Sequence, residues 1–348
     1  MSVLDWIWEK ADACLQLNKP FTMYATPGNN TVTAYFQRDA NIHFAEDFTR
    51  SGFIFCSFDG NSRLLIPADA SDVYSTAIVA ESGVFEEILW PEPTEAKAPF
   101  ESIVSKAVVE IQQGTFAKVV LSRRETVAIS DGFQSNFTRM FAAYPNAFRY
   151  VWFHPETGMW MGATPERLIQ IENRNFKTVA LAGTQAFLGN ESVQWAEKER
   201  AEQQFVTDFI IDGLQPHTAD LKTSAPYTAR AGNLWHIKTD IEGQLAPHAH
   251  LRDIVTVLHP TPAVCGYPKA EAMAFIAQHE GYDRKFYSGF LGTITPDSAD
   301  LYVNLRCMEL HEKTAHLYIG CGITKDSNPE KEFEETANKA LTMKKILR

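Results

Sequence analysis

The chain has 348 residues, 45% of them hydrophobic and 22% charged, which allows a large buried core and excludes a wholly disordered protein. Its 32 basic and 43 acidic side chains give a formal net charge of −11, which argues against a nucleic-acid-binding or anionic-membrane surface. An acidic chain that binds anions must therefore concentrate positive charge locally or recruit a metal.

The N-terminal part is predicted to hold short strands and to end at a change of composition. Strands are expected at Gly52–Phe58 and Arg63–Pro67. The segment Trp90–Pro99 is crowded with Pro, Glu and Ala, which predicts a linker or long loop. Apolar residues then recur at helical spacing from Phe100 to Ile111, and Gly114 is a natural C-cap for that helix.

The remainder of the chain is predicted to alternate blocks of strands with a few helices. Helices are expected at Glu197–Asp212, with Gly213 as the stop, and from near Asn328 to the end. Strands are expected at Phe116–Ser122, Arg149–His154, Met159–Ala163, Phe176–Leu181, Tyr287–Thr295, Leu301–Leu310 and Ala315–Ile323. Strands in blocks indicate an α+β layered fold rather than regular βαβ winding.

Targeting and redox signals are weak. No segment reaches the roughly 18 apolar residues of a membrane span, and the start, Met1–Trp6, lacks the basic region of a signal peptide. The five cysteines are scattered without a Cys-x-x-Cys pair. We therefore expect free thiols, no zinc site and a cytoplasmic protein.

Lys118 stands out because it lies inside a predicted strand. With a period of two, Lys118, Val120 and Ser122 share one face. Such a lysine is either a charge that protects an edge strand or a partly desolvated amine that can serve as a base. Glu166 follows directly after a strand that stops at Thr164-Pro165, which makes it a rim carboxylate or a solvated turn acid.

Acidic residues on two predicted helices form a second candidate group. Glu199 and Glu202 extend the apolar stripe of one helix, and Glu332 and Glu335 form a stripe with Lys339 on the last helix. Ordinary helix-start acids and surface ion pairs account for such patterns. Alternatively, Glu202 and Glu335 bind Mg²⁺, which prefers oxygen ligands and keeps waters that Glu199 and Glu332 would hold.

Small and cationic residues at strand ends suggest contacts with a ligand. Gly320 and Gly322 permit close backbone approach or form a bend, and Gly183-Thr184 ends another strand with a hydroxyl. Arg306 either binds a carboxylate of a ligand or forms an ion pair on an edge strand. His259 either orients a substrate or caps a turn.

In their order along the chain, these segments resemble the chorismate-utilising enzymes, which include anthranilate, aminodeoxychorismate, salicylate and isochorismate synthases. The resemblance covers about residues 100–348. It is carried by Lys118-Val-Val-Leu-Ser-Arg123, Thr164-Pro-Glu166, Leu181-Ala-Gly-Thr184, Glu197-Lys-Glu-Arg-Ala-Glu202, Asp283-Arg284, Gly320-Cys-Gly-Ile323 and Phe333-Glu-Glu-Thr336 with Lys339.

Within the family, the sequence is most similar to isochorismate synthases. The loop from His259 to Pro268 has their form, and Ala182 stands where aminodeoxychorismate synthases carry a nucleophilic lysine. Gln185 stands at a position where many relatives carry a different residue, so the local contacts with the substrate are expected to differ there. The resemblance implies that Lys118 activates water, that Glu166 is the general acid and that Glu202 and Glu335 bind Mg²⁺. It also implies substrate contacts from Gly183, Thr184, His259, Arg306, Gly320, Gly322 and Lys339.

The resemblance further implies a single α+β unit, 1–348, whose two sheet-rich halves pack with helices outside and the site in the cleft. Residues 1–95 form a divergent N-terminal part and 99–348 the catalytic part. The implied reaction converts chorismate to isochorismate for menaquinone or siderophore synthesis, in a monomer or weak homo-oligomer without a glutaminase subunit. A salicylate synthase, and a non-catalytic chorismate- or Mg²⁺-binding protein, are the alternatives.

Overall fold

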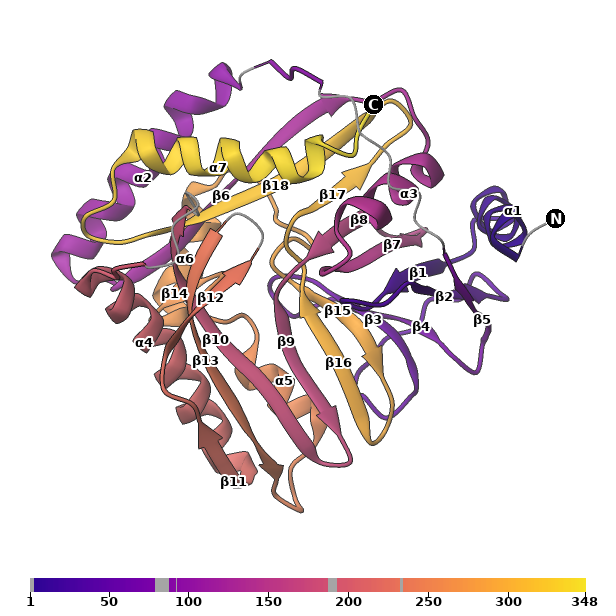
Figure 1. Ribbon diagram of the computed structural model, residues 1–348, viewed down its shortest axis with the longest axis horizontal. Helices are drawn as coiled ribbons and strands as arrows, with labels where there is room; N and C mark the ends of the chain where they lie inside the picture. The colour runs from indigo at the N-terminus through magenta and orange to yellow at the C-terminus, as the bar shows by residue number, and fades with distance from the viewer. Residues whose placement is uncertain (1–2, 79–87, 92, 187–192, 232–233) are drawn as a thin grey trace.

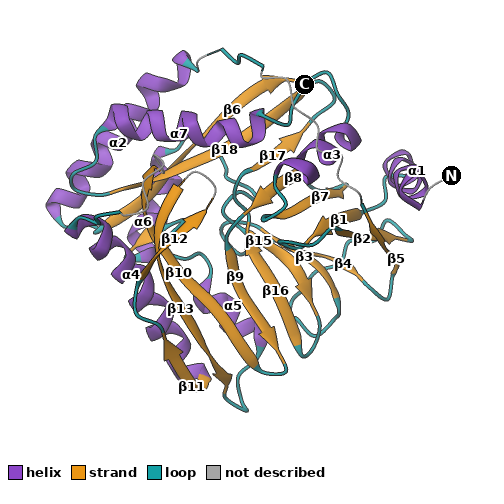
Figure 2. Cartoon of the chain, in the orientation of Figure 1, coloured by secondary structure: helices purple, strands orange, loops and turns teal. Residues whose placement is uncertain are grey.

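Two large antiparallel sheets form the body of the protein, and helices cover their outer faces (Figure 1). The computed structural model describes residues 3–78, 88–91, 93–186, 193–231 and 234–348. Helices and strands are both abundant in this part of the chain (Figure 2), which confirms the predicted α+β class.

The strands follow one another in space in an order far from that of the sequence. In the first sheet the order is β14 (Gly266–Tyr267), β6 (Lys118–Ala128), β18 (Thr314–Ile323), β17 (Cys307–Leu310), β8 (Gly158–Thr164), β7 (Phe148–His154), β1 (Phe21–Ala25), β2 (Thr31–Gln37) and β5 (Ser71–Ala77). In the second sheet it is β11 (Thr218–Thr223), β13 (Leu234–Leu245), β10 (Asn175–Ala186), β9 (Arg167–Glu172), β16 (Ser298–Val303), β15 (Phe290–Ile294), β3 (Gly52–Cys56) and β4 (Arg63–Pro67), with β12 (Tyr227–Ala231) also paired to β13. Strands from the first 95 residues thus join both sheets.

The inner faces of the sheets meet through an aromatic core. Phe53 and Phe55 of β3 contact Trp152 of β7, and Phe55 stacks on Phe286 with ring centroids 4.4 Å apart. Aromatic side chains suit strands, where they pack against neighbours across the sheet. This core holds the strands β7 and β8 of the first sheet against β3, β15 and β16 of the second.

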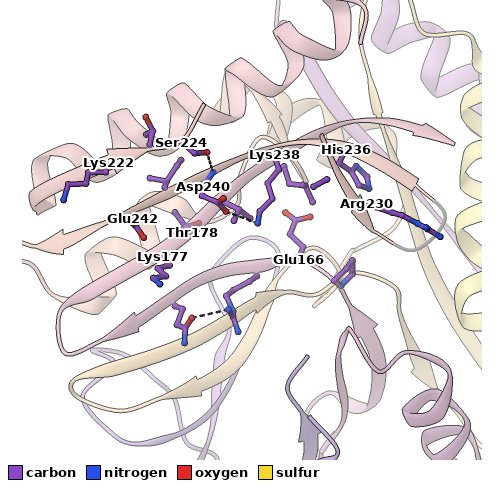
Figure 3. Close-up of a pocket in the computed structure, with 18 residues that line it drawn as sticks. Glu166, Lys177, Thr178, Lys222, Ser224, Arg230, His236, Lys238, Asp240 and Glu242 are labelled. Carbon is purple, nitrogen blue, oxygen red and sulfur yellow. Dashed lines mark hydrogen bonds and ion pairs between the residues drawn. The ribbon is translucent and has the colours of Figure 1, made fainter. Parts of the chain in front are cut away.

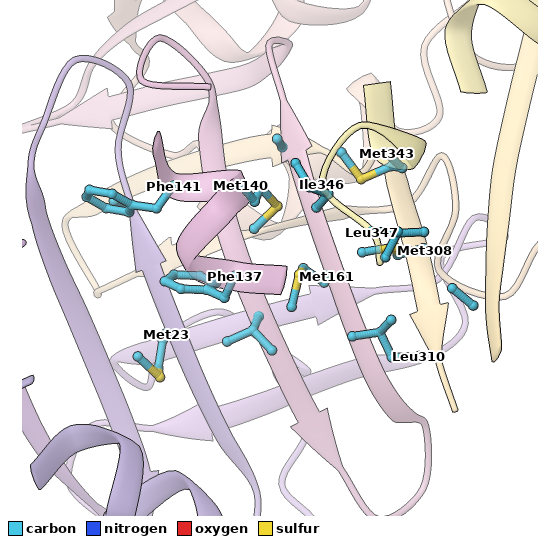
Figure 4. Close-up of a cluster of buried hydrophobic side chains, with 14 of the residues drawn as sticks. Met23, Phe137, Met140, Phe141, Met161, Met308, Leu310, Met343, Ile346 and Leu347 are labelled. Atoms are coloured by element: carbon cyan, nitrogen blue, oxygen red, sulfur yellow. The ribbon is translucent and has the colours of Figure 1, made fainter. Parts of the chain in front are cut away.

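Helices bury the outer faces. The helices are α1 (Val3–Gln16), α2 (Thr94–Gln113), α3 (Phe133–Ala143), α4 (Glu197–Leu214), α5 (Leu251–Leu258), α6 (Lys269–His279) and α7 (Pro329–Lys344), with a 3-10 turn at Gln215–His217. Helices α4 and α5 cover the second sheet. Helices α1, α3 and the end of α7 cover part of the first, and Figure 4 shows side chains of α3 and α7 packed on its strands. None of the described helices is long and apolar enough to cross a membrane. The five cysteines are buried free thiols, as predicted.

Several predicted elements are confirmed and others are corrected. Gly114 caps α2 at φ 84°, and the side chain of Asn328 caps α7 by accepting from the Lys331 backbone N–H. Helix α2 begins at Thr94, inside the predicted linker, and α4 continues through Gly213. The predicted strand Leu301–Leu310 is two strands, β16 and β17, because the chain crosses there from the second sheet to the first.

Candidate active site

Residues of both sheets and of helices α4 and α7 line one cavity of about 200 Å³. The fold brings nine of the predicted site residues to it from segments that are distant in the sequence. They are Lys118, Glu166, Gly183, Glu202, Arg306, Gly320, Gly322, Glu335 and Lys339.

Lys118 is a buried amine rather than an exposed edge charge. Strand β6 lies between β14 and β18, and the Lys118 side chain is only 2% exposed. The alternation of the strand turns Val119 and Leu121 to the helices and Lys118 to the cavity. Its Nζ lies 2.6 Å from Oε1 of Glu202 on α4, so burial of the charge is compensated by an ion pair.

Glu166 is half-buried on another part of the cavity wall, two residues after the end of β8. Burial raises the pKa of its carboxyl to about 7, although the nearby positive charges of Lys118, Arg306 and Lys339 act in the opposite direction. The carboxyl is therefore partly protonated near neutral pH, a state in which it can donate a proton.

Two cations face this acid. Arg306 lies at φ 47° in the short connection where the chain crosses between sheets, so it is not inside a strand as predicted. Lys339 of α7 places its Nζ 2.6 Å from Oε1 of Glu335 and donates a hydrogen bond to the Gly320 carbonyl oxygen at 3.1 Å. Both cations line the cavity, so they can attract an anionic ligand.

Two glycines permit the close packing of the cavity wall. A Cβ on Gly322 would lie 3.2 Å from both Oε1 of Glu202 and Cε of Lys118, which is tighter than an ordinary contact. Gly183 has φ +69° at a bulge in the pairing of β10 with β13, a conformation that favours glycine.

Four glutamates of two helices share one wall: Glu199 and Glu202 of α4, and Glu332 and Glu335 of α7. Glu202 and Glu335 are ion-paired with the cavity lysines. Oε2 of Glu199 is buried and has no hydrogen-bond partner among the described residues. In their present positions, no three acidic, histidine or cysteine side chains of the described part converge as a metal site.

One predicted substrate contact, His259, does not line the cavity. His259 is buried, and its Nε2 lies 3.1 Å and 3.0 Å from the carbonyl oxygens of Ser57 and Phe58. The imidazole therefore ties a loop to the end of β3, and in this structure it has no contact with the cavity. The side chain of Thr184, another predicted substrate contact, does not belong to the part of the chain that the structure describes.

Sequence reasoning missed three polar residues of the cavity, His236, Tyr287 and Ser288. Nδ1 of His236 lies 3.1 Å from the carbonyl oxygen of Gly183, and burial lowers the pKa of the imidazole, so the ring is neutral at pH 7. The sequence pattern that could have revealed His236 is the run of polar residues at alternate positions 236, 238, 240 and 242 along β13, which marks a strand face not packed against helices.

A family model described as a chorismate binding enzyme matches residues 79–348. The chain therefore belongs to the chorismate binding enzyme family. Among similar proteins, a salicylate biosynthesis isochorismate synthase of Pseudomonas aeruginosa is 33% identical over 268 residues, which is 71% of this chain and 54% of that protein. The isochorismate synthase EntC of Escherichia coli is 29% identical over 272 residues, 75% of this chain and 68% of EntC. The alignment thus spans about half to two thirds of these relatives' lengths.

Solved structures confirm the predicted fold of the chorismate-utilising enzymes. A putative 2,3-dihydroxybenzoate-specific isochorismate synthase, DhbC of Bacillus anthracis, matches with a TM-score of 0.79 at 22% identity, over 97% of this chain and 99% of that chain. The menaquinone-specific isochorismate synthase MenF of Escherichia coli also gives 0.79 at 22% identity, over 100% of this chain and 92% of that chain.

Proposed function

We propose that this protein is an isochorismate synthase, which interconverts chorismate and isochorismate. The observation that carries the proposal is a buried lysine and a carboxyl with a raised pKa on the wall of one cavity, with two cations beside them. The names of similar proteins, including the isochorismate synthases of Pseudomonas aeruginosa and Escherichia coli, support the same activity.

Recognition of chorismate requires positive charge, because the substrate carries two carboxylates and the chain has a net charge of −11. Arg306 and Lys339 provide that charge inside the cavity. The guanidinium of Arg306 can bind one carboxylate through two parallel hydrogen bonds. We infer that the two cations fix the ring between Lys118 and Glu166.

The reaction adds water at ring carbon C2 and removes the hydroxyl at C4 as the ring double bonds shift. In this proposal Lys118 accepts a proton from the attacking water, and Glu166 donates a proton to the departing hydroxyl. One water molecule enters and one leaves, so the atoms balance. The reverse reaction uses the same two groups with their proton positions exchanged.

Both directions need one proton shared between Lys118 and Glu166. The forward reaction starts with that proton on Glu166 and the reverse reaction starts with it on Lys118. Because burial raises the pKa of Glu166 to about 7, the state with its carboxyl protonated is accessible at neutral pH. At pH 7, a solvated glutamate with a pKa near 4.3 would have a ratio of protonated to ionised form about 500-fold lower.

The acidic wall fits Mg²⁺, and we propose it as the cofactor. Its four donor residues offer only carboxylate oxygens, and Oε2 of Glu199 is a buried oxygen without a partner among the described residues. Glu202 and Glu335 would hold the ion, which needs only one or two protein carboxylates because it keeps waters and binds the substrate. When bound, Mg²⁺ would supply positive charge against a substrate carboxylate.

Product analysis tests the proposal. Purified protein is incubated with chorismate and Mg²⁺, products are separated by chromatography, and pyruvate is measured with a coupled dehydrogenase. We expect isochorismate without pyruvate, and the same mixture of the two compounds when isochorismate is supplied first. Salicylate with pyruvate would identify a salicylate synthase. Binding without any conversion would identify a non-catalytic protein, and a Lys118→Ala preparation controls for host enzymes.

A further inference from the structure

A second cavity, of about 760 Å³, lies beside the catalytic cavity. Figure 3 shows the residues that line it. Its lining comes from neighbouring strands of the second sheet, β9, β10, β13, β11 and β12. Four residues line both cavities: Pro165, Glu166, Leu181 and His236. The two cavities therefore meet at the proposed general acid.

Strand alternation explains why this cavity has a charged floor. On β13, Ile237 and Thr239 are buried, and Oγ1 of Thr239 accepts a hydrogen bond from Gln203 of α4. The alternate residues of this strand, Lys238 and Asp240, point to the opposite face and line the cavity. The same face of this sheet is aromatic further along, where β3, β15 and β16 pack on the first sheet. The cavity thus occupies the part of the inner face that carries charge.

The sign of the charge reverses in this cavity. Five basic side chains face three acidic ones, an excess of two positive charges in a chain of net charge −11. The basic residues are Arg167, Lys177, Lys222, Arg230 and Lys238, and the acidic residues are Glu166, Asp240 and Glu242. A concave region of locally reversed sign raises the concentration of anions near it.

The cations in the floor differ in how they are held. Nζ of Lys238 lies 2.9 Å from Oδ1 of Asp240, whose Oδ2 accepts a hydrogen bond from the Tyr227 hydroxyl at 2.8 Å. Although desolvation opposes it, this hydrogen bonding raises the pKa of Lys238 and keeps the ammonium charged. Lys177 on the adjacent strand is exposed and makes no ion pair with the described residues. One cation is therefore oriented and the other is available to a ligand.

We propose that this cavity, the basic vestibule, binds small carboxylate anions and passes them to the catalytic cavity beside it. The proposal rests on the proposed function, which makes chorismate, a dicarboxylate, the anion that must enter. A small anion fits because the vestibule is a hollow in a sheet face that leads to Glu166.

A vestibule of this kind acts on the approach of the substrate and not on the chemical step. Reversing the positive charge of the vestibule should lower kcat/KM and weaken the dependence of kcat/KM on ionic strength, because steering by charge is screened by salt. The value of kcat should stay unchanged. Loss of a catalytic group would instead lower kcat at every salt concentration.

The test is the double charge reversal Lys177→Glu/Lys238→Glu, assayed with chorismate at low and high ionic strength. The matched control is Lys106→Glu/Lys313→Glu, which changes the net charge equally at two exposed lysines outside both cavities. We expect kcat/KM at low salt to fall about tenfold in the vestibule variant, within the range of electrostatic steering, and less than about twofold in the control. The difference should disappear at high salt.

A vestibule variant whose kcat/KM and salt dependence match those of the control would overturn the proposal. If Lys238→Glu disturbs folding, as judged by circular dichroism, Lys177→Glu/Lys222→Glu replaces it, since both of these lysines are exposed. If the wild-type protein does not convert chorismate, the proposed function fails. The vestibule is then judged alone, from salt-dependent association rates of chorismate measured by tryptophan fluorescence in the same variants.

Discussion

Replacing Gly322 by alanine tests the geometry of the Lys118–Glu202 pair without removing either group. Gly322 lies on β18 opposite Val120 of β6. The added Cβ would lie 3.2 Å from Oε1 of Glu202 and 3.2 Å from Cε of Lys118. Because ordinary contacts are about 3.5–4.0 Å, both side chains must retreat by a few tenths of an ångström. The nearest atoms are the far ends of side chains, so the backbone can keep its place.

We expect kcat of Gly322→Ala to fall about tenfold, since a displacement of about 1 Å at a reacting group can cost 10²-fold. The assay is initial-rate chromatography of isochorismate, with thermal unfolding measured in parallel. Gly132→Ala is the control, because an added Cβ there meets nothing within 4 Å and its φ of −69° suits alanine. A folded Gly322→Ala protein with wild-type kcat would refute the role given to this pair.

Three further changes probe the catalytic groups. Lys118→Ala should lower kcat by about 10² to 10⁴ in a folded protein, and near-normal turnover would show that the base lies elsewhere. Glu202→Gln and Glu335→Gln should each raise the Mg²⁺ concentration needed for half-maximal activity. If both variants show the Mg²⁺ dependence of the wild-type protein, the two carboxylates serve only as ion-pair partners of lysines. The value of kcat/KM should rise with pH through about 7, because protonation of Glu166 below that pH adds a proton to a catalytic pair that must share only one. A profile that is flat from about pH 5 to pH 8 would contradict the raised pKa of Glu166.

Local patterns in the sequence were sufficient where they fix a side chain's direction. The period of two placed Lys118 on a face away from Val119, and the structure has this arrangement. The helical stripe that extended to Glu202 likewise turns that carboxylate to the cavity. The order of the motifs identified the family and its fold, but the domain boundaries within 1–348 remain predictions.

Contacts between distant segments were beyond such patterns. The run from Leu301 to Leu310 is apolar enough for one strand, and only pairing partners in two different sheets divide it around Arg306. The orientation of His259 depends on carbonyl oxygens about 200 residues away in sequence, at Ser57 and Phe58. His236 gave no signal as a single residue, because its neighbours in the cavity come from other strands and helices.

Isotopic labelling in heavy-oxygen water tests the central claim most directly. In the proposed mechanism, solvent water activated by Lys118 enters at C2 while the C4 hydroxyl leaves with a proton from Glu166. Isochorismate formed from unlabelled chorismate should therefore carry one heavy oxygen at C2 by mass spectrometry, and chorismate recovered at equilibrium should gain label at C4. Glu166→Gln should bind chorismate and show almost no exchange at either position. Unlabelled isochorismate formed by the wild-type protein would contradict the account, because the hydroxyl would then have moved within the substrate.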